Sequence, residues 1–223
     1  MLPMLTRKRG FLPLSLALLA VGAGLLAFGA VMVVSGSDDG VRLPPVTISP
    51  IAATAPSTPK PLIVNDSPIS RLVIHSIGID APVQVFGLDG NNFPVVPDSS
   101  NSRNPGNIVA WYDFSKLPGQ GSNAVFAGHV TWEGTAIFYN LQNVQAGDRI
   151  SVFTQDGKEL VYEVFYLDLV DPSRVDLMDA TNEDMVTLIT CGGTWIPDRS
   201  NPYGGEYINR VVVRARLAGL GPL

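Results

Sequence analysis

Three residues in this sequence carry side chains that could act together in nucleophilic catalysis: a thiol, an imidazole and a guanidinium. Cys191 is the only cysteine among 223 residues, and it ends the apolar run TLITC directly before two glycines. A thiol of ordinary pKa, about 8.5, is only a few per cent ionised at neutral pH, so a reactive cysteine needs a basic or cationic neighbour. The chemistry therefore depends on which residues lie beside Cys191.

His129 is a candidate partner because its local sequence is similar to that of Cys191. It follows the apolar run NAVFAG, so each residue stands at the end of a strand-like segment and beside a glycine. Strand ends gather at the rim of a barrel, where residues far apart in sequence can meet. The alternatives are an inert buried cysteine and a turn or capping histidine, such as His75 within its own strand-like run. The residue types alone favour these alternatives.

Arg210 is the candidate cation, and it belongs to the run INRVVVRARL at residues 208–217. A period of two gives this run a core face made of Val211, Val213, Ala215 and Leu217. The opposite face then holds Arg210, Val212, Arg214 and Arg216. We expect Arg210 to point outward, either as a solvated charge like Arg214 and Arg216 or as a guanidinium lining a surface groove. Taken alone, the pattern favours the solvated charge.

The elements that must position these side chains are strands. From Ile69 onward, short β-branched runs alternate with turn residues, and the only short helix we expect covers residues 136–142. The sequence Asp156-Gly157 predicts a hairpin, because both residues tolerate the positive φ of a primed turn. About eight strands indicate an all-β barrel or sandwich. The expected strands cover residues 71–75, 81–86, 108–111, 124–128, 149–155, 160–169, 186–190 and 208–217.

The N-terminal segment predicts a membrane anchor. Residues 11–34 are 24 residues without a charge, enough at roughly 1.5 Å per residue to cross a hydrocarbon core of about 30 Å. The basic residues before this run and the acidic residues after it predict a cytoplasmic N-terminus. A cleaved signal peptide is the alternative, although its apolar region is usually shorter. We expect a cytoplasmic segment at 1–10, an anchor at 11–35, a proline-rich linker at 36–68 and an extracellular domain at 69–223.

Composition argues against several classes of function. The formal net charge is −5 and no basic block lies beyond the extreme N-terminus, so nucleic acid is not an expected partner. A lone cysteine cannot form an intramolecular disulfide, and two histidines give no zinc-binding spacing. No cofactor is expected; calcium is the one metal left open, because acidic residues precede the TLITC run, although solvated charges are the favoured interpretation. The acidic residues are Asp168, Asp171, Asp176, Asp179, Glu183 and Asp184.

The motifs TLITC, the upstream AGH and the downstream NRVVVRA, together with an all-β domain behind an N-terminal anchor, resemble the sortases, a family of cell-surface cysteine transpeptidases. The likeness extends over residues 71–217. It implies a closed or nearly closed eight-stranded β-barrel with short helices and loops. In this barrel Cys191 would be the nucleophile, His129 the general acid and base, and Arg210 the cation that positions substrate and stabilises the oxyanion. It also implies that Thr190 contacts the bound peptide.

The resemblance further implies substrates and partners. The substrates would be secreted proteins with a sorting signal of the LPxTG or LAxTG type, cut between Thr and Gly, and the acyl group would pass to a cell-surface amine or to water. Gly192-Gly193 and Trp195 are similar to the class E and F sortases, but Arg210 is two positions closer to the valine run than in class F. The subclass therefore stays open, and with it the sorting motif.

Two other functions remain as alternatives to the transpeptidase. The first is a catalytically silent, surface-tethered β-domain that binds protein or glycan, in which Cys191 and Arg210 serve packing and solubility. The second is a papain-type peptidase. It is disfavoured because its cysteine precedes its histidine and starts a helix, whereas here His129 comes first and both residues follow strand-like runs.

Overall fold

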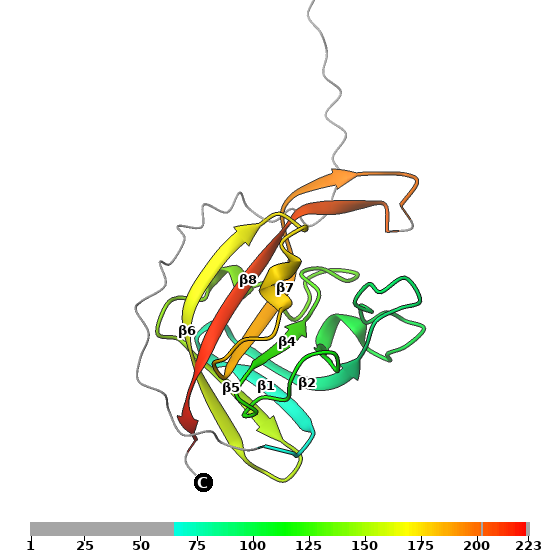
Figure 1. Ribbon diagram of the computed structural model, residues 1–223. Coiled ribbons are helices and arrows are strands. Elements are labelled where there is room, and N and C mark those ends of the chain that lie inside the picture. The colour runs from blue at the N-terminus through cyan, green and yellow to red at the C-terminus, as the bar shows by residue number, and fades with distance from the viewer. Residues whose placement is uncertain (1–64, 202, 222–223) are drawn as a thin grey trace, which may run out of the picture. The chain divides into compact units, whose positions relative to one another are not determined.

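The chain folds into an eight-stranded closed β-barrel, as the sequence predicted. The structure is a computed structural model that describes residues 65–201 and 203–221. The strands follow one another around the barrel in the order β1-β2-β3-β4-β7-β8-β6-β5 (Figure 1). Their bounds are β1 Ile69–Ile74, β2 Ile79–Phe86, β3 Val109–Tyr112, β4 Asn123–Ala127, β5 Arg149–Thr154, β6 Glu159–Val170, β7 Met185–Pro197 and β8 Gly205–Leu220.

Two parallel strand pairs determine which distant segments become neighbours. The pairs β2–β3 and β4–β7 are parallel, and the other neighbours are antiparallel. Parallel pairing needs a crossover, and the crossover from β4 to β7 contains both β5 and β6. The ends of β4 and β7, which are far apart in sequence, therefore lie side by side.

Strand alternation builds the core, and β8 follows the predicted pattern with one exception. Val211, Val213 and Ala215 are buried in the main core cluster. Val212 faces outward, yet it is also buried, because it packs with Leu177 in a second cluster. Leu177 belongs to the short 3-10 helix η4, Val175–Met178, in the β6–β7 connection. This connection therefore covers part of the outer face of β8.

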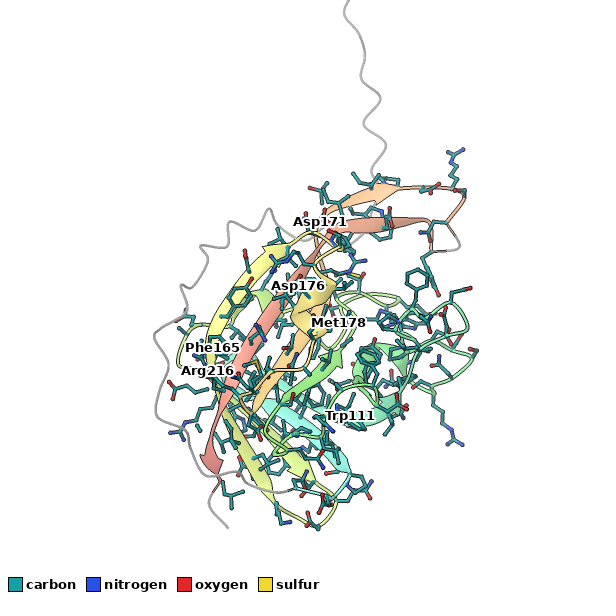
Figure 2. All side chains as sticks on the ribbon, in the orientation of Figure 1. Trp111, Phe165, Asp171, Asp176, Met178 and Arg216 are labelled. Carbon is teal, nitrogen blue, oxygen red and sulfur yellow. The ribbon has the colours of Figure 1, made fainter. Side chains whose placement is uncertain are left out.

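The prediction that Arg214 and Arg216 are solvated charges is wrong, because both are half-buried and engaged. The Arg214 guanidinium lies 2.9 Å from the Met185 sulfur through Nη2, and burial lowers its pKa. Arg216 donates from Nε to Glu183 at 2.7 Å, and its guanidinium carbon lies 3.7 Å from the ring centroid of Phe165, its labelled neighbour in Figure 2. Long cationic side chains can bury their stems along apolar surface and stack on rings, and Arg214 and Arg216 are partly withdrawn from water in this way.

The helix predicted at residues 136–142 is wrong in most of its length. Only a 3-10 helix, η3 at Leu141–Asn143, forms there, after a series of turns. The backbone N–H groups of Ile137 and Phe138 donate to Gly106 at 2.7 Å and to His129 at 2.9 Å. The N–H groups of Tyr139 and Leu141 donate three residues back, to Ala136 at 3.0 Å and to Phe138 at 3.1 Å, so tight turns form here in place of the four-residue spacing of an α-helix.

The turn between β5 and β6 is the predicted hairpin. Gly157 has a φ of 87°, and its N–H donates to the Thr154 carbonyl at 3.2 Å. The expected strand at 71–75 ends one residue earlier, so His75 opens the exposed 3-10 turn η1, His75–Ile77, and does not lie within a strand. A glycine at position 78 with φ 72° closes that turn.

The expected anchor at 11–35 lies outside the described residues. Within 65–201 and 203–221, no helix is long and apolar enough to cross a bilayer. The described chain begins four residues before the expected domain boundary at Ile69, and Asn65 is fully buried there. Its side-chain amide donates to the Pro118 carbonyl at 3.0 Å, so the end of the linker packs on the domain.

Several of the acidic residues before β7 accept hydrogen bonds from protein groups. Asp176 pairs with Arg174, Asp171 caps its own turn, and Figure 2 shows Asp171 and Asp176 at different places along the β6–β7 connection. Asp184 accepts from the N–H groups of Gly119 and Gly121 at 3.2 Å and 2.8 Å. In the part of the chain that the structure describes, no group of three or more His, Cys, Asp or Glu residues could hold a metal ion.

Candidate active site

Strands β7 and β8 place Cys191 directly opposite Arg210 in their antiparallel register. Cys191 is half-buried and shares the outer face of β7 with Ile189, while Arg210 is on the outer face of β8. The sequence placed Cys191 at a strand end. In the structure β7 continues to Pro197, because it forms a hairpin with β8 that reaches beyond the neighbouring strands (Figure 1). The thiol and the guanidinium therefore share one face of a continuous two-stranded ribbon.

The parallel pair β4–β7 brings His129 to the same place. Its last register pair is Ala127 with Ile189, and His129 and Cys191 each lie two residues further on. Two hydrogen bonds hold the chains together past that pair: Gly128 N–H to the Ile189 carbonyl at 3.2 Å, and the Thr190 hydroxyl to the Gly128 carbonyl at 2.8 Å. Since side chains two apart point to the same face, His129 and Cys191 lie on adjacent chains and face outward together.

Thr190 occupies the inner side of this junction. It is 4% exposed, and its hydroxyl is committed to the Gly128 carbonyl. In this structure its side chain ties the chain before His129 to the chain before Cys191. The peptide contact that the family resemblance implies for Thr190 would need this bond to be exchanged.

The glycines beside the candidate residues are required by close packing and by backbone conformation. A Cβ on Gly128 would lie 2.8 Å from the Phe138 ring, and a Cβ on Gly192 would lie 2.7 Å from a Val211 methyl. Gly193 has a φ of 76°, a left-handed conformation that L side chains rarely adopt. The one-residue bulge between Gly192 and Trp195 starts here and redirects β7 just after Cys191.

The His129 ring is held on two sides. Its Nε2 lies 2.7 Å from the carbonyl oxygen of Pro97, and its ring centroid lies 4.8 Å from that of Trp132. A carbonyl oxygen can only accept a hydrogen bond, so Nε2 carries the hydrogen and Nδ1 is the nitrogen that gains and loses a proton. The histidine is therefore held by a specific neighbour and is not a free turn residue.

Burial makes the neutral forms of the two groups more stable. Desolvation raises the pKa of the Cys191 thiol; the Arg210 charge opposes this shift and Glu206 adds to it. Desolvation likewise lowers the pKa of His129, against the hydrogen bond to Pro97 and the charge of Asp98. At neutral pH a thiol and a neutral imidazole therefore predominate, and the thiolate–imidazolium pair is a minor population.

Arg210 is oriented by two backbone carbonyls. Its Nη1 donates to the carbonyls of Tyr207 and Asn209, each at 2.9 Å. Among the described residues these are its hydrogen bonds, so the donors on Nε and Nη2 stay available to a bound ligand. The arrangement can supply a nucleophile, a proton carrier and a fixed cation to one substrate.

Pro97, Asp98 and Trp132 surround His129, and the sequence did not identify them. Pro97 and Asp98 belong to the long connection after β2, where the sequence shows only turn-forming residues. Trp132 follows His129 closely, yet a lone aromatic residue carries no catalytic pattern. Only the fold brings the three residues together.

A closed barrel that brings a thiol, an imidazole and a guanidinium to one outer face has the kinds of group that acyl transfer through a cysteine requires. Residues 72–218 match the Sortase domain family, so the chain belongs to the sortase family of cysteine transpeptidases. The resemblance read from TLITC, AGH and NRVVVRA is confirmed at the level of the family. The match does not distinguish the class E and F groups.

Individual relatives agree with this assignment. The sortase-related protein YwpE of Bacillus subtilis (strain 168) is 34% identical over 69 residues, 31% of this chain and 67% of that protein. Among solved structures, sortase A of Listeria monocytogenes is 21% identical with a TM-score of 0.52, over 71% of this chain and 92% of that chain. At this identity the similarity supports the fold alone.

Two further sortases have a similar fold. A lid mutant of sortase A from Corynebacterium diphtheriae is 27% identical with a TM-score of 0.51, over 71% of this chain and 74% of that one. Sortase C1 of pilus island 1 from group B Streptococcus is 23% identical with a TM-score of 0.51, over 67% of this chain. The present chain spans 64% of that sortase C1.

Proposed function

We propose that this protein is a surface sortase that cuts a sorting signal of the LPxTG or LAxTG type between Thr and Gly and transfers the acyl group to an amine or to water. The observation that carries the proposal is the strand register that puts Cys191 opposite Arg210 and beside His129. Cys191 is the nucleophile, His129 the general acid and base, and Arg210 the oxyanion-stabilising cation.

In the first step the Cys191 thiolate attacks the threonine carbonyl of the sorting signal. The carbonyl oxygen becomes an oxyanion, which the free donors of Arg210 stabilise in a half-buried site where such donors are more effective than in water. The His129 imidazolium gives its proton to the departing glycine amine. The C–N bond breaks and a thioester forms on Cys191.

In the second step an amine or water attacks the thioester carbonyl. Neutral His129 takes the proton from the attacking group, the C–S bond breaks, and the Cys191 thiolate is regenerated. Thr190 keeps the two catalytic chains in register through its bond to Gly128. An amine on the cell wall or on a pilin is the proposed acceptor, and a secreted protein with a C-terminal sorting signal is the proposed donor.

The setting of the reaction is also part of the proposal. The uncharged run at 11–34, with basic residues before it, supports a single-pass anchor with a cytoplasmic N-terminus and an extracellular catalytic domain. The proline-rich stretch that follows would act as the spacer. Gly192-Gly193 and Trp195 support a relation to the class E and F sortases, but Arg210 departs from the class F pattern, so the proposal keeps both LPxTG and LAxTG as sorting motifs.

A peptide panel tests this function. The full chain is incubated with fluorogenic LPxTG and LAxTG peptides, with and without calcium and a glycine-based amine, and the products are analysed by mass spectrometry. We expect cleavage between Thr and Gly, and ligation when the amine is present. Folded protein that cleaves no peptide under any of these conditions would support the silent, binding β-domain instead.

The pH profile of kcat/KM is a second prediction. The active form needs a thiolate and an imidazolium, so activity falls in acid as the thiolate fraction is lost and in alkali as the imidazolium is lost. In the coupled pair, the acidic limb follows the lowered pKa of His129 and the alkaline limb the raised pKa of Cys191. We expect a broad bell that is flat between about pH 6.5 and about 8.5.

Initial rates at low substrate concentration from pH 5 to pH 10 check this expectation. A rate that climbs to an alkaline plateau would mean that no imidazolium is needed. A narrow bell with both limbs inside the expected plateau would contradict the pKa directions that burial gives to the pair.

A further inference from the structure

The connection from β2 to the 3-10 helix η2, Pro105–Asn107, brings a backbone carbonyl to the active site. We name residues 87–104 the β2–β3 loop. Pro97, near its middle, is buried, whereas most residues around it are exposed. The Pro97 carbonyl lies 2.7 Å from Nε2 of His129, which is 32 positions further along the chain. A loop that is otherwise exposed thus contributes one buried contact, and this contact is to the candidate acid and base.

A single side chain fixes both neighbours of Pro97. The Asn101 amide donates from Nδ2 to the Val96 carbonyl at 3.3 Å and accepts at Oδ1 from the Asp98 N–H at 2.8 Å. The Asp98 carboxylate then accepts from the Ser100 N–H at 2.8 Å and from the Asn101 N–H at 3.2 Å. Asn101 therefore holds the backbone on either side of the carbonyl that meets His129.

The remaining sides of His129 are also held. The Phe138 N–H donates to the His129 backbone carbonyl at 2.9 Å, and Trp132 packs against the ring at 4.8 Å between centroids. The β4–β7 junction brings Cys191 to the outer face beside it. With Nε2 engaged, the ring has one nitrogen, Nδ1, left for proton exchange.

Charges around the ring come from three elements. Asp98 of the β2–β3 loop and the hydrogen bond to Pro97 both raise the pKa of His129 against the effect of burial. From β7 and β8, Cys191 and Arg210 lie on the same outer face, and Glu206 acts on the Cys191 thiol. The loop is thus the element that favours the imidazolium, the form that protonates the leaving amine.

We propose that the β2–β3 loop is a positioning element of the reaction, in which Asn101 holds the Pro97 carbonyl and this carbonyl fixes the His129 ring through Nε2, so that proton exchange with substrate takes place at Nδ1. The inference rests on the acid and base role of His129 proposed above. Asn101 is exposed, and it acts through the backbone of Val96 and Asp98 on either side of Pro97.

The kinetic test compares two asparagines of the same loop. Asn101→Ala removes the clamp; Asn91→Ala is the matched control, because Asn91 is exposed and only its backbone N–H joins a turn, at Asp89. In the full chain we expect Asn101→Ala to lower kcat by roughly ten- to a hundred-fold with little change in KM for the peptide. Its acidic limb should move to lower pH, since His129 loses the bond to Pro97, whereas Asn91→Ala should match the parent protein.

The spectroscopic test needs no activity. Nitrogen-15 NMR of the full chain at alkaline pH should find His129 as the Nε2–H tautomer, with exposed His75, the only other histidine, as the internal reference. Asn101→Ala should give a mixture of tautomers. An Nδ1–H tautomer in the parent protein would overturn the proposal without any variant, and so would an active Asn101→Ala protein with unchanged rate, pH profile and tautomer.

The two tests separate this inference from the proposed function. If the parent protein cleaves no peptide but His129 is the Nε2–H tautomer and Asn101→Ala disturbs it, the positioning contact stands and the transpeptidase proposal fails. If the parent cleaves and Asn101→Ala behaves like Asn91→Ala, the transpeptidase stands and the positioning role fails.

Discussion

Cys191→Ala abolishes both peptide cleavage and ligation. The thiol is the only cysteine sulfur in the chain, so no other residue can form the thioester. Removal of a catalytic nucleophile costs on the order of 10⁴- to 10⁶-fold in turnover, which puts the variant at the detection limit of a peptide assay. Cleavage is measured by chromatography of the peptide products over several hours.

Cys191→Ser is the matched control, because it keeps the size of the side chain and changes only the acidity and nucleophilicity of the attacking atom. We expect it to be as inactive as Cys191→Ala, with both variants melting close to the parent protein since Cys191 is only half-buried. Residual cleavage above a few per cent in Cys191→Ala would mean that another group performs the reaction.

Arg210→Ala has the second largest expected effect. We expect turnover to fall by two to three orders of magnitude, roughly the effect of removing one oxyanion donor. The pKa of Cys191 should also rise further, because in the parent protein the Arg210 charge lowers this pKa against the effect of burial and the variant lacks that charge. The melting temperature should change little, because Arg210 points outward and, within residues 65–201 and 203–221, its hydrogen bonds go to the Tyr207 and Asn209 carbonyls of its own strand.

Arg216 on the same face of β8 provides the control. It pairs with Glu183 and stacks on Phe165, at the opposite end of the strand from the thiol. Arg216→Ala should lower the melting temperature by a few degrees and leave kcat unchanged. The reverse outcome would be an Arg216→Ala protein that is stable but slow, together with an Arg210→Ala protein that is unstable but active. That result would assign the structural role to Arg210.

Much of the fold could be predicted because strand alternation is a local property. All eight expected strands form, although β7 continues beyond its expected end at Thr190 to Pro197, and the Asp156-Gly157 hairpin forms as expected. The errors have non-local causes. The segment predicted as a helix is bonded to Gly106 and His129 and folds into tight turns. The β6–β7 connection buries Val212 on the outer face.

Part of the candidate site could likewise be predicted from local sequence, and part could not. Cys191, His129 and Arg210 could be identified by their motifs, and the register that brings them together follows from the closed barrel. The Pro97 carbonyl could not be found, because every residue of the chain offers the same backbone carbonyl. Its importance depends on Asn101 and on a loop path that no local pattern encodes.

The most direct test of the central claim is the mass of the acyl-enzyme. The full chain is mixed with an intact LPxTG or LAxTG peptide that it cleaves, quenched in acid within seconds, digested and analysed by tandem mass spectrometry. We expect an adduct of the acyl fragment ending in threonine on Cys191, which hydroxylamine or a glycine amine removes. Cleavage of the peptide without an adduct on Cys191 at any quench time, or with one on another residue, would contradict the central claim.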